Sequence, residues 1–418
     1  MSPQSTDSLW RMNEQSRTTD TNVTYEEDSP LAFDFSRRSL LSFGAGATIA
    51  GLGGCATAAQ TTEASAAEAV GAFPAHKASD GSELLGPESG VALLSRNENP
   101  YGPAKSAKKG IAYAAEKGAY YPGVAYEELA KLIAERHGVT PDMIAITTGS
   151  GEALCAIALM YGPKGPIVAP RLFWDTTALY AQNLGMATIS RVALTPDMGV
   201  DLAAIEAAVT PQTGLVQLCN PNNPTGMLSD PAAIKAAVTR MSKKTTVLVD
   251  EAYMELADDP DANTCIGLVK DGHDVIVSRT FSKIYGMAGI RVGYTIAAPE
   301  TSAKIRSTAM SWIAGTGLSG AISCYNDMAF VDYSKSKVKE ARDMITTTLD
   351  ALDMTYLPSS TNFVYFKSGK PANDIQKALA EKQIMIRGQY MDYVDWSRVS
   401  MGKIADVERF CKALPTVV

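Results

Sequence analysis

One lysine in the sequence lies among small and hydroxylated residues, in a loop that follows the apolar run 275–279. Lys283 has few charged neighbours there, and a lysine removed from water has a lowered pKa, so its amine can act as a nucleophile. Thr280, Ser282 and Arg291 belong to the same stretch and could together face one phosphate. Taken alone, Lys283 could equally be an ordinary surface side chain.

Two further strand-like runs end in side chains suited to bind a ligand. Asp250 ends the apolar run 246–250, where a buried carboxylate is costly unless a cation pairs with it. A protonated ring nitrogen would serve, and a helix N-cap is the plain alternative. Asn223 lies in NPNNPTG (220–226), where two Asn-Pro steps fix a turn after the run 214–219. This amide could be aimed at a ligand oxygen, or the segment could be only a turn.

A fourth stretch, GSGEAL (149–154), links a short strand predicted at Ile144–Thr148 to a helix predicted over 152–161. Its glycines allow close backbone approach, and free amides at a helix N-terminus bind phosphate; a tight turn without function is the alternative. The four stretches together offer a phosphate cradle, a carboxylate for a ring nitrogen, an amide and Tyr253 for a ring hydroxyl, and an amine that can form an imine. This set of groups describes pyridoxal phosphate.

Short apolar runs alternate with helical stretches from about residue 125, which predicts a mainly parallel sheet covered by helices on both faces. Ligands of such sheets lie at the strand ends, where the four stretches fall. After a long helical stretch over 317–350, the pattern changes to that of a smaller α+β domain. Its predicted strands include 363–367 and 398–401, and a last helix is predicted at 404–413.

The composition argues against several other classes of protein. The chain has 418 residues, 46% of them hydrophobic, which is ample for a large core and a smaller domain. Its net charge of −7 and its lack of a basic stripe argue against nucleic-acid binding. Six scattered cysteines without a CxxC pair indicate neither a zinc site nor a disulfide framework, and three histidines argue against histidine-based metal catalysis.

The amino-terminal region has the composition of a leader. Residues 1–35 are polar and predicted to be disordered. Residues 36–58 combine two arginines with a short, weakly apolar run and a small-residue cleavage site, which resembles a twin-arginine export signal. Cys55 could instead mark a lipoprotein, or the arginine pair could be a chance feature of a disordered tail. With a linker expected at 59–90, we expect an exported or periplasmic protein, or a cytoplasmic one if the signal is unused.

Several motifs taken together resemble the fold-type I, class I/II pyridoxal-phosphate aminotransferases, and most closely the histidinol-phosphate aminotransferases. The resemblance runs from about residue 91 to the end. It implies an α/β fold with a large domain at 125–316 on a mainly parallel seven-stranded sheet, a small α+β C-terminal domain at 317–418, and an arm at 91–124 joining the small domain. The motifs are NENPYGP (97–103), GSGEAL (149–154), NPNNPTG (220–226), VDEAY (249–253), RTFSKIYGMAGIRVG (279–293), PSSTNF (358–363) and RVSMG (398–402).

The resemblance also implies how the cofactor is held. Lys283 would carry it as an internal aldimine and then move a proton between the substrate α-carbon and the cofactor. Asp250 would keep the ring nitrogen protonated, and Tyr253 would bond the ring hydroxyl together with Asn223. Lys283, Asp250 and Tyr253 are therefore the predicted catalytic residues. The predicted phosphate contacts are Gly151, Glu152, Ala153, Thr280, Ser282 and Arg291, with Tyr121 reaching the phosphate of a neighbouring subunit.

For the substrate, the resemblance implies a pocket with two arginines. Arg398 would clamp a carboxylate with its guanidinium fork, and the other predicted contacts are Asn99, Tyr101, Asn362 and Arg387. The aromatic that stacks on the ring in this family has no direct match, so Trp174 is expected to take this role, with Phe173 beside it. The contact expected from Tyr121 implies an obligate homodimer with shared active sites.

Three functions stay open on the sequence alone. The favoured one is an aminotransferase that passes an amino group from an amino acid or a histidinol-phosphate-like donor to a 2-oxo acid by a ping-pong mechanism. A decarboxylase or other lyase on the same scaffold, similar to the phosphothreonine decarboxylases, is the alternative. A cofactor-holding binding module is disfavoured by the intact Lys283. Histidine biosynthesis is cytoplasmic, so an exported enzyme would serve another pathway.

Overall fold

The computed structural model describes residue 78 and residues 82–418. The predicted leader at 1–35, the predicted signal at 36–58 with Cys55, and most of the predicted linker at 59–90 lie outside the described residues. Within the described part of the chain, none of the helices has the length and apolar character needed to cross a membrane.

A seven-stranded sheet forms the centre of the larger domain, with the strand order β2-β8-β7-β6-β5-β3-β4. Neighbouring strands from β4 to β7 run parallel, and β8 runs antiparallel to both of its neighbours, β7 and β2. This confirms the predicted α/β class with a mainly parallel sheet. The strands are β2 (Ile144–Thr147), β3 (Ile167–Pro170), β4 (Ile189–Val192), β5 (Leu215–Cys219), β6 (Val247–Asp250), β7 (Val275–Thr280) and β8 (Gly293–Ile296).

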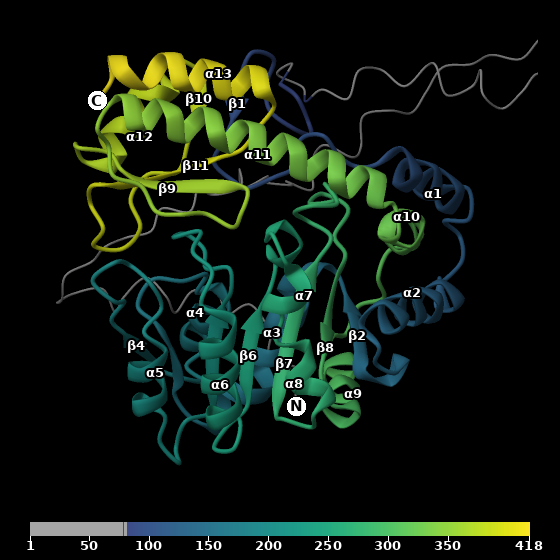
Figure 1. Cartoon of the computed structure of the whole chain (residues 1–418). Helices are drawn as coiled ribbons and strands as arrows, with labels where there is room; N and C mark the ends of the chain where they lie inside the picture. Colours follow the sequence, from purple (N-terminus) through teal and green to yellow (C-terminus); the bar gives the residue numbers. More distant parts are fainter. Residues whose placement is uncertain (1–77, 79–81) are drawn as a thin grey trace, which may run out of the picture. The chain divides into compact units, whose positions relative to one another are not determined.

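Alternate side chains of each strand point to opposite faces of this sheet, as β6 illustrates. Val247 and Val249 belong to one buried cluster with Ile234, whereas Leu248 between them belongs to another with Ile157. Helices cover both faces and bury the parallel strands (Figure 1). The helices up to residue 325 are α1 (Lys105–Ala115), α2 (Gly123–His137), α3 (Gly149–Tyr161), α4 (Thr176–Asn183), α5 (Leu202–Ala208), α6 (Pro231–Met241), α7 (Pro260–Asn263), α8 (Ile266–Lys270), α9 (Pro299–Thr308) and α10 (Gly315–Tyr325).

A smaller domain lies over the carboxyl ends of these strands (Figure 1). Its antiparallel pair β9 (Phe363–Lys367) and β11 (Trp396–Ser400) is accompanied by a parallel pair, β1 (Ala92–Leu93) and β10 (Ile384–Met385). Because β1 belongs to this pair, the segment around residue 92 folds with the smaller domain. Its helices are α11 (Met328–Ala351), α12 (Ala372–Ala380) and α13 (Ile404–Ala413), which confirms the predicted last helix.

The single helical stretch predicted over 317–350 is wrong, because α10 ends at Tyr325 and α11 begins at Met328. Asp327 separates them. Its carboxylate accepts from the Phe330 amide at 3.1 Å, as an N-cap does, and from the Ser106 hydroxyl at 2.6 Å. The apolar pattern alone could not show this start, because aspartate favours a cap over a helix interior by its side-chain hydrogen bond.

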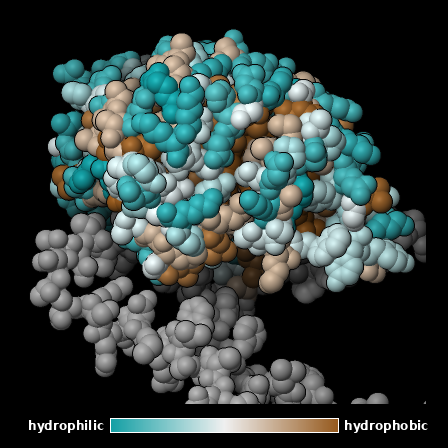
Figure 2. All heavy atoms as spheres, turned by 90° about the horizontal axis from the view of Figure 1, so that it is seen from below, coloured by the Kyte–Doolittle hydropathy of each residue, from teal (hydrophilic) through white to brown (hydrophobic). Residues whose placement is uncertain are grey.

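The two ends of the parallel strands in the larger domain have different surroundings. Figure 2 views the molecule from the side of the amino ends of the parallel strands, where hydrophilic residues cover much of the face and hydrophobic residues form small groups. The carboxyl ends instead face the smaller domain (Figure 1). Parallel sheets place their ligands at the carboxyl ends, and the predicted site residues follow strands at this end.

Candidate active site

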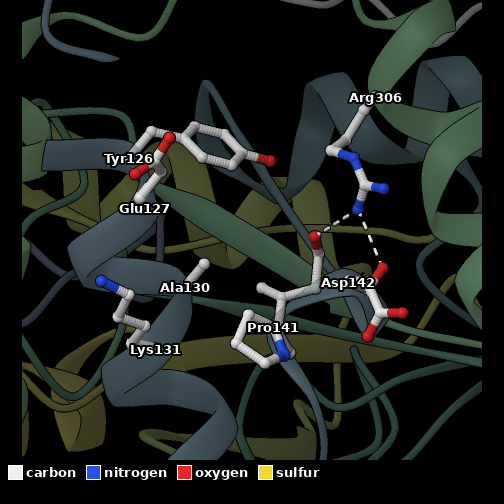
Figure 3. A pocket seen from close by; sticks show the side chains of 8 residues that line it. Tyr126, Glu127, Ala130, Lys131, Pro141, Asp142 and Arg306 are labelled. Atoms are coloured by element: carbon white, nitrogen blue, oxygen red, sulfur yellow. Dashed lines mark hydrogen bonds between the residues drawn. The ribbon is translucent and has the colours of Figure 1, made fainter. Parts of the chain in front are cut away.

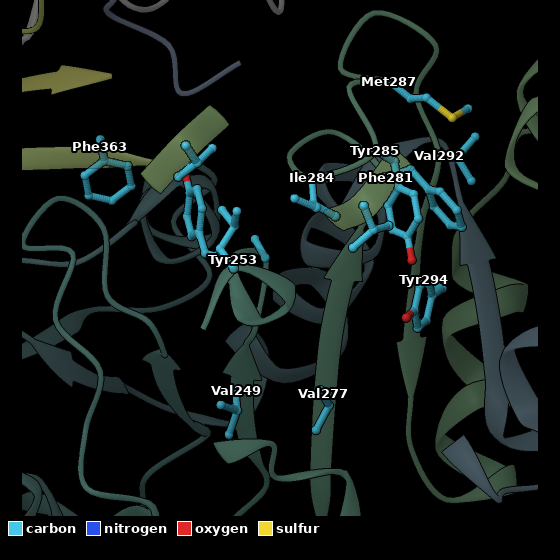
Figure 4. Packing of buried hydrophobic residues seen from close by; sticks show 14 of the residues in the cluster. Val249, Tyr253, Val277, Phe281, Ile284, Tyr285, Met287, Val292, Tyr294 and Phe363 are labelled. Carbon is cyan, nitrogen blue, oxygen red and sulfur yellow. The ribbon is translucent and has the colours of Figure 1, made fainter. Parts of the chain in front are cut away.

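Lys283 lies in a short loop between β7 and β8 that is closed by packing. A backbone hydrogen bond of 3.1 Å joins Met287 to Phe281, and both side chains are buried (Figure 4). The Lys283 Nζ donates to the Arg96 carbonyl at 3.3 Å and lies 5.6 Å from the centre of the Tyr253 ring. The amine is therefore directed at the space between the two domains, where a ligand would meet it.

The environment of Lys283 favours its uncharged form. Burial, and then the nearby Arg398, lowers the pKa of the Lys283 amine to about 8, although Glu98 and Asp250 oppose this. Near neutral pH a useful fraction of the amine is then unprotonated. This is the form that attacks a carbonyl carbon, so Lys283 can bond an aldehyde.

Asp250 ends β6 and has an unsatisfied buried oxygen. The residue is 3% exposed, and its Oδ1 has no hydrogen-bond partner among the described residues. Burial raises the pKa of Asp250 to about 7, because an isolated carboxylate is poorly stabilised away from water. A protonated ring nitrogen would supply the missing partner. The carboxyl group thus fits the pyridinium end of pyridoxal phosphate.

Tyr253 brings together side chains from distant parts of the chain. Its hydroxyl accepts hydrogen bonds from Asn97 Nδ2 at 3.0 Å and from Asn223 Nδ2 at 3.4 Å. Its ring packs edge-on against Phe363 of β9, with centroids 5.3 Å apart (Figure 4). Burial raises the pKa of Tyr253 well above its usual range. The phenol therefore keeps its proton and can donate it in a hydrogen bond.

Glycines bring the start of α3 into contact with Arg291. A Cβ on Gly149 would lie 2.3 Å from Arg291 Nη2, and one on Gly293 would lie 2.1 Å from the Ser150 nitrogen. The residues at both positions must therefore lack a side chain for the guanidinium to lie beside the helix N-terminus. Free amides and an arginine at one place form a site for a phosphate.

The helix predicted over 152–161 begins earlier, at Gly149. The first amides of a helix lack an intrahelical acceptor, and here they belong to Gly149, Ser150 and Gly151. The amides of Glu152 and Ala153 lie inside the helix instead. The geometry therefore favours the first three residues as amide donors to a phosphate, over the predicted contacts from Glu152 and Ala153.

Thr280 and Ser282 gather beside the same arginine. Thr280 Oγ1 donates to Ser282 Oγ at 3.0 Å, and Arg291 Nη1 reaches Ser282 Oγ at 3.4 Å and the Ala288 carbonyl at 2.8 Å. Arg291 is exposed and has the left-handed backbone angle φ of 64°. Hydroxyls and guanidinium converge where the glycines leave room, so the three predicted phosphate contacts are brought together.

Arg398 is a buried cation without a carboxylate partner among the described residues. It is 4% exposed, and it donates from Nη1 to Asn223 Oδ1 and from Nη2 to the Ser95 carbonyl, both at 2.6 Å. Its Nε has no partner among the described residues. Such a cation can take up a substrate carboxylate. Arg387 pairs with it through the backbone, and the two guanidinium carbons each lie 5.5 Å from the centre of the Tyr390 ring.

The two adjacent aromatics at 173 and 174 differ in exposure. Phe173 is 4% exposed and belongs to a core cluster, whereas Trp174 is 42% exposed. The Trp174 carbonyl accepts from Gln217 of β5 at 3.4 Å, and Cys219 on this strand pairs with Asp250. The Trp174 side chain is thus exposed, on a residue whose backbone lies beside β5, while the Phe173 ring is committed to the core.

The structure places Asn99 and Tyr101 in packing contacts, which differs from their predicted role as substrate contacts. Asn99 Nδ2 donates to the Ile284 carbonyl at 2.7 Å and to Ser334 Oγ at 3.0 Å. The Tyr101 hydroxyl accepts from the amide of Ile404 at 3.0 Å. Their polar groups are already satisfied by the chain. Asn99 instead holds the residue next to Lys283.

Asn362 and Asn97 are joined to each other at the domain junction. Asn362 Nδ2 donates to the Asn97 carbonyl at 2.9 Å, and its buried Oδ1 has no partner among the described residues, so it remains able to accept from a ligand. Asn97 and its partner Ser400 were not among the predicted site residues. Both stand in recognised motifs, NENPYGP and RVSMG, but no sequence spacing relates them to Tyr253.

Tyr121 is not brought to the other predicted site residues of its own chain. It is 83% exposed, and its ring packs against Trp312 with centroids 5.5 Å apart. The predicted contact of Tyr121 is with a neighbouring subunit, so its exposure leaves that prediction in place.

A separate hollow of about 280 Å³ lies between α2, the turn at Pro141–Met143 and Arg306 of α9 (Figure 3). Arg306 is held there by the carbonyls of Asp142 at 3.0 Å and Ile144 at 2.8 Å. None of the predicted site residues lines this hollow. We therefore assign the chemistry to the domain junction.

The lysine, the unpaired aspartate and the phosphate cradle define a pyridoxal-phosphate-dependent enzyme on a fold-type I scaffold. The chain belongs to the class I and II aminotransferase family, whose model matches residues 89–414. It is thus a transaminase that uses pyridoxal phosphate, acting on small-molecule amino donors and 2-oxo acid acceptors.

Its relatives include several histidinol-phosphate aminotransferases. The chain is 33% identical over 321 residues to that of Limosilactobacillus fermentum, covering 76% of this chain and 88% of the relative. A solved histidinol-phosphate aminotransferase from Sinorhizobium meliloti, in complex with pyridoxal-5'-phosphate, has 30% identity and a TM-score of 0.72 over 78% of this chain and 90% of that one. Aspartate aminotransferase from Thermus thermophilus, with 19% identity and a TM-score of 0.69 over 78% and 92%, shares the fold.

Proposed function

We propose that the enzyme moves an amino group from an amino acid or a histidinol-phosphate-like donor to a 2-oxo acid, by a ping-pong mechanism that uses Lys283. The observation that carries this proposal is the meeting of Lys283, Asp250 and Arg398 at one junction, each without the partner its chemistry calls for. Among the described residues, Lys283 Nζ donates only to a carbonyl at 3.3 Å, the Asp250 Oδ1 has no partner, and Arg398 is paired only with neutral oxygens.

Each of these side chains has a separate task in the proposal. Bound pyridoxal phosphate supplies a ring that withdraws electrons from the substrate α-carbon. The Asp250 carboxylate keeps the ring nitrogen protonated, and Arg398 holds the substrate carboxylate. Lys283 Nζ moves the proton to and from the α-carbon, and its pKa of about 8 suits it both to accept and to release a proton near neutral pH.

The surroundings of Arg398 favour a donor with a planar ring. The Tyr390 ring lies within 5.5 Å of both guanidinium groups, those of Arg387 and Arg398, and it meets Tyr365 edge-on at 6.1 Å. Trp396 stacks on Tyr365 with centroids 5.0 Å apart. Tyr390, close to two cations, suits a ligand that has a ring and an anionic group, and the fully buried Tyr365 packs behind it. Histidinol phosphate and the aromatic amino acids have these parts.

A homodimer is part of the proposal. Exposed apolar side chains gather on the loops before α2 and after α9, where Trp312 is 65% and Met310 is 92% exposed. Tyr121 packs on Trp312 at this place, and Val124 beside it is 81% exposed. A patch of this kind marks an interaction site. We expect a dimer in light scattering and a shift toward monomer in the Trp312→Ser variant.

Export through the twin-arginine route is also proposed, and only the sequence at 36–58 supports it. This route carries folded proteins, so the enzyme could bind its cytoplasmic cofactor before it leaves. Replacing Arg37 and Arg38 by lysine should move the protein from the periplasmic to the cytoplasmic fraction. An unchanged distribution would contradict the proposal.

The test of the reaction uses the purified holoenzyme and its visible absorption. Single amino acids and histidinol phosphate are added one at a time, followed by a 2-oxo acid. We expect a ring-bearing donor to convert the cofactor to its amino form, and 2-oxoglutarate to reverse the change. Release of carbon dioxide without the amino form would favour the lyase. Absence of a cofactor band in reconstituted protein would overturn the role of Lys283.

A further inference from the structure

Asn97 is held by the chain on every side at the domain junction. It is 2% exposed and has a left-handed backbone angle φ of 58°, a conformation that asparagine tolerates better than most residues. Its carbonyl accepts from Asn362 at 2.9 Å, and its amide nitrogen donates to Ser400 Oγ at 2.9 Å. These bonds fix the backbone, so the direction of the Asn97 side chain is also fixed.

Ser400 determines which way round the Asn97 side-chain amide lies. Because Ser400 Oγ already accepts from the Asn97 backbone nitrogen, its one proton is free for the Asn97 Oδ1, at 2.7 Å. The oxygen of the amide therefore faces Ser400. The Nδ2 group faces Tyr253 and donates to its hydroxyl at 3.0 Å.

Arg398 fixes the second amide beside Tyr253 in the same way. A guanidinium can only donate, so the atom of Asn223 that lies 2.6 Å from Arg398 Nη1 is Oδ1. The Nδ2 group of Asn223 then faces the Tyr253 hydroxyl at 3.4 Å. Both amides are donors toward the phenol, and neither can accept its proton.

The phenol proton of Tyr253 is consequently left for a third partner. Two donors occupy the lone pairs of the oxygen, and among the described residues no acceptor for its proton is found. The ionisable groups nearest Tyr253 come from three elements: Asp250 and Cys219 at the ends of neighbouring strands and Arg398 of β11. Lys283 approaches the ring from the β7–β8 loop.

We propose that Asn97, oriented by Ser400, is a positioning residue that obliges Tyr253 to donate its hydrogen bond to the ring oxygen of the cofactor. This inference rests on the proposed placement of the cofactor between Lys283 and Asp250. Donation stabilises the anionic form of the ring oxygen. Removing it raises the proton affinity of the bound cofactor and loosens its binding.

The test is Asn97→Asp, which keeps the shape and the tolerance for a left-handed backbone but replaces a donor by an acceptor. The phenol proton would then turn toward the new carboxylate. We expect the pH midpoint of the visible cofactor band to rise by about one unit, a tenfold change in proton affinity. We also expect the dissociation constant of pyridoxal phosphate from the apoprotein to rise about tenfold. Ser400→Ala should give a smaller shift in the same direction.

Two controls separate positioning from structure. Asn263→Asp makes the same change at another buried asparagine, whose Nδ2 donates to the Asp259 carbonyl at 2.6 Å, and should leave the midpoint in place. In a Tyr253→Phe background, Asn97→Asp should shift the midpoint less than it does in the wild-type background, because only the charge of the new carboxylate then acts and the phenol does not. A folded Asn97→Asp protein with an unchanged midpoint, or a full extra shift in the Tyr253→Phe background, would overturn the inference. A wild-type protein without any cofactor band would instead overturn the proposed placement of the cofactor.

Discussion

Asp250 and Glu251 are adjacent carboxylates, both almost completely buried, at the end of one strand. Glu251 is saturated with partners: Arg279 Nη2 at 2.7 Å and Nε at 2.9 Å, the Thr264 hydroxyl at 2.7 Å and the Cys265 amide at 2.6 Å. Asp250 has an oxygen with no partner among the described residues. Alternation along the strand sends the two side chains to opposite sides. On the side of Glu251 the protein supplies every hydrogen-bond partner, and on the side of Asp250 an oxygen is available to a ligand.

The difference separates a carboxylate that stabilises the fold, Glu251, from one that is available to a ligand, Asp250. A buried carboxylate that is fully hydrogen-bonded stabilises its surroundings only while all its partners remain. A buried carboxylate with a free oxygen destabilises the apoprotein, and this cost is removed when a cation binds. The arginines repeat the contrast, since Arg279 bonds Glu251 and Glu255, whereas Arg398 bonds only neutral oxygens within residues 82–418.

The largest effect is expected for Asp250→Asn. The isosteric amide cannot keep the ring nitrogen protonated, so kcat should fall by about 1000-fold. Thermal unfolding of the apoprotein should show no loss of stability, because an unsatisfied charge has been removed. An apoprotein as destabilised as a Glu251 variant would show that Asp250 is structural.

Glu251→Gln should instead lower the stability of the protein. Leaving Arg279 without its closest carboxylate is expected to cost about 3 kcal/mol of unfolding free energy, measured by denaturant titration. The matched control is Glu255→Gln, since Glu255 is more exposed and meets the same arginine through one bond at 3.0 Å. If Glu255→Gln lowers the unfolding free energy as much as Glu251→Gln does, burial does not determine the strength of the ion pair between Arg279 and Glu251.

Arg398→Lys tests the arginine half of the comparison. An ammonium cannot offer two parallel hydrogen bonds to a carboxylate, so kcat/KM for amino acids should fall about 30-fold, mainly through KM. Arg279→Lys should instead lower stability. A drop in kcat at unchanged KM for Arg398→Lys would show that this side chain acts in the chemical step and does not hold the substrate.

The most gradual effect, spread over several pH units, is the pH dependence of apoprotein stability. Asp250 titrates near 3.9 in an unfolded chain and near 7 in the fold. Between these values the folded protein binds more protons, so unfolding free energy should fall as pH rises, by at most about 1.4 kcal/mol per unit. Lys283, with its pKa lowered to about 8, gives the opposite slope above that pH. Asp250→Asn should abolish the fall in unfolding free energy between about pH 4 and pH 7. If this fall is unchanged in the variant, the raised pKa assigned to Asp250 is wrong.

The site residues at the strand ends could be predicted from the sequence, because parallel strands have their carboxyl ends at one edge of the sheet, where ligands bind. Asp250, Asn223 and Lys283 follow β6, β5 and β7, which are neighbours in the sheet, and the short apolar runs before them are enough to place them together. The start of α3 at Gly149 was missed because glycine is a poor helix former. Its position is set by the close approach of Arg291, a contact that no local pattern carries.

Contacts between remote segments could not be predicted from spacing. Asn97 reaches Tyr253 across 156 positions of the chain and Ser400 across 303. The motifs that contain them could be recognised, but their geometry depends on how the smaller domain sits on the larger one. For the same reason Asn99 and Tyr101 could not be distinguished from Asn97, although the structure gives their polar groups to Ile284, Ser334 and Ile404.

The pairing of β1 with β10 and of Asn97 with Ser400 has a consequence for the order of events during synthesis. The first described strand, at Ala92–Leu93, can pair only after Ile384–Met385 has been synthesised. A ribosome that has reached residue 300 has already made Lys283, Asp250 and the phosphate cradle, yet Arg398 and Ser400 do not exist. Such long-range contacts form late. The nascent chain thus contains the lysine and the phosphate cradle well before it contains the arginine that is proposed to hold a substrate carboxylate.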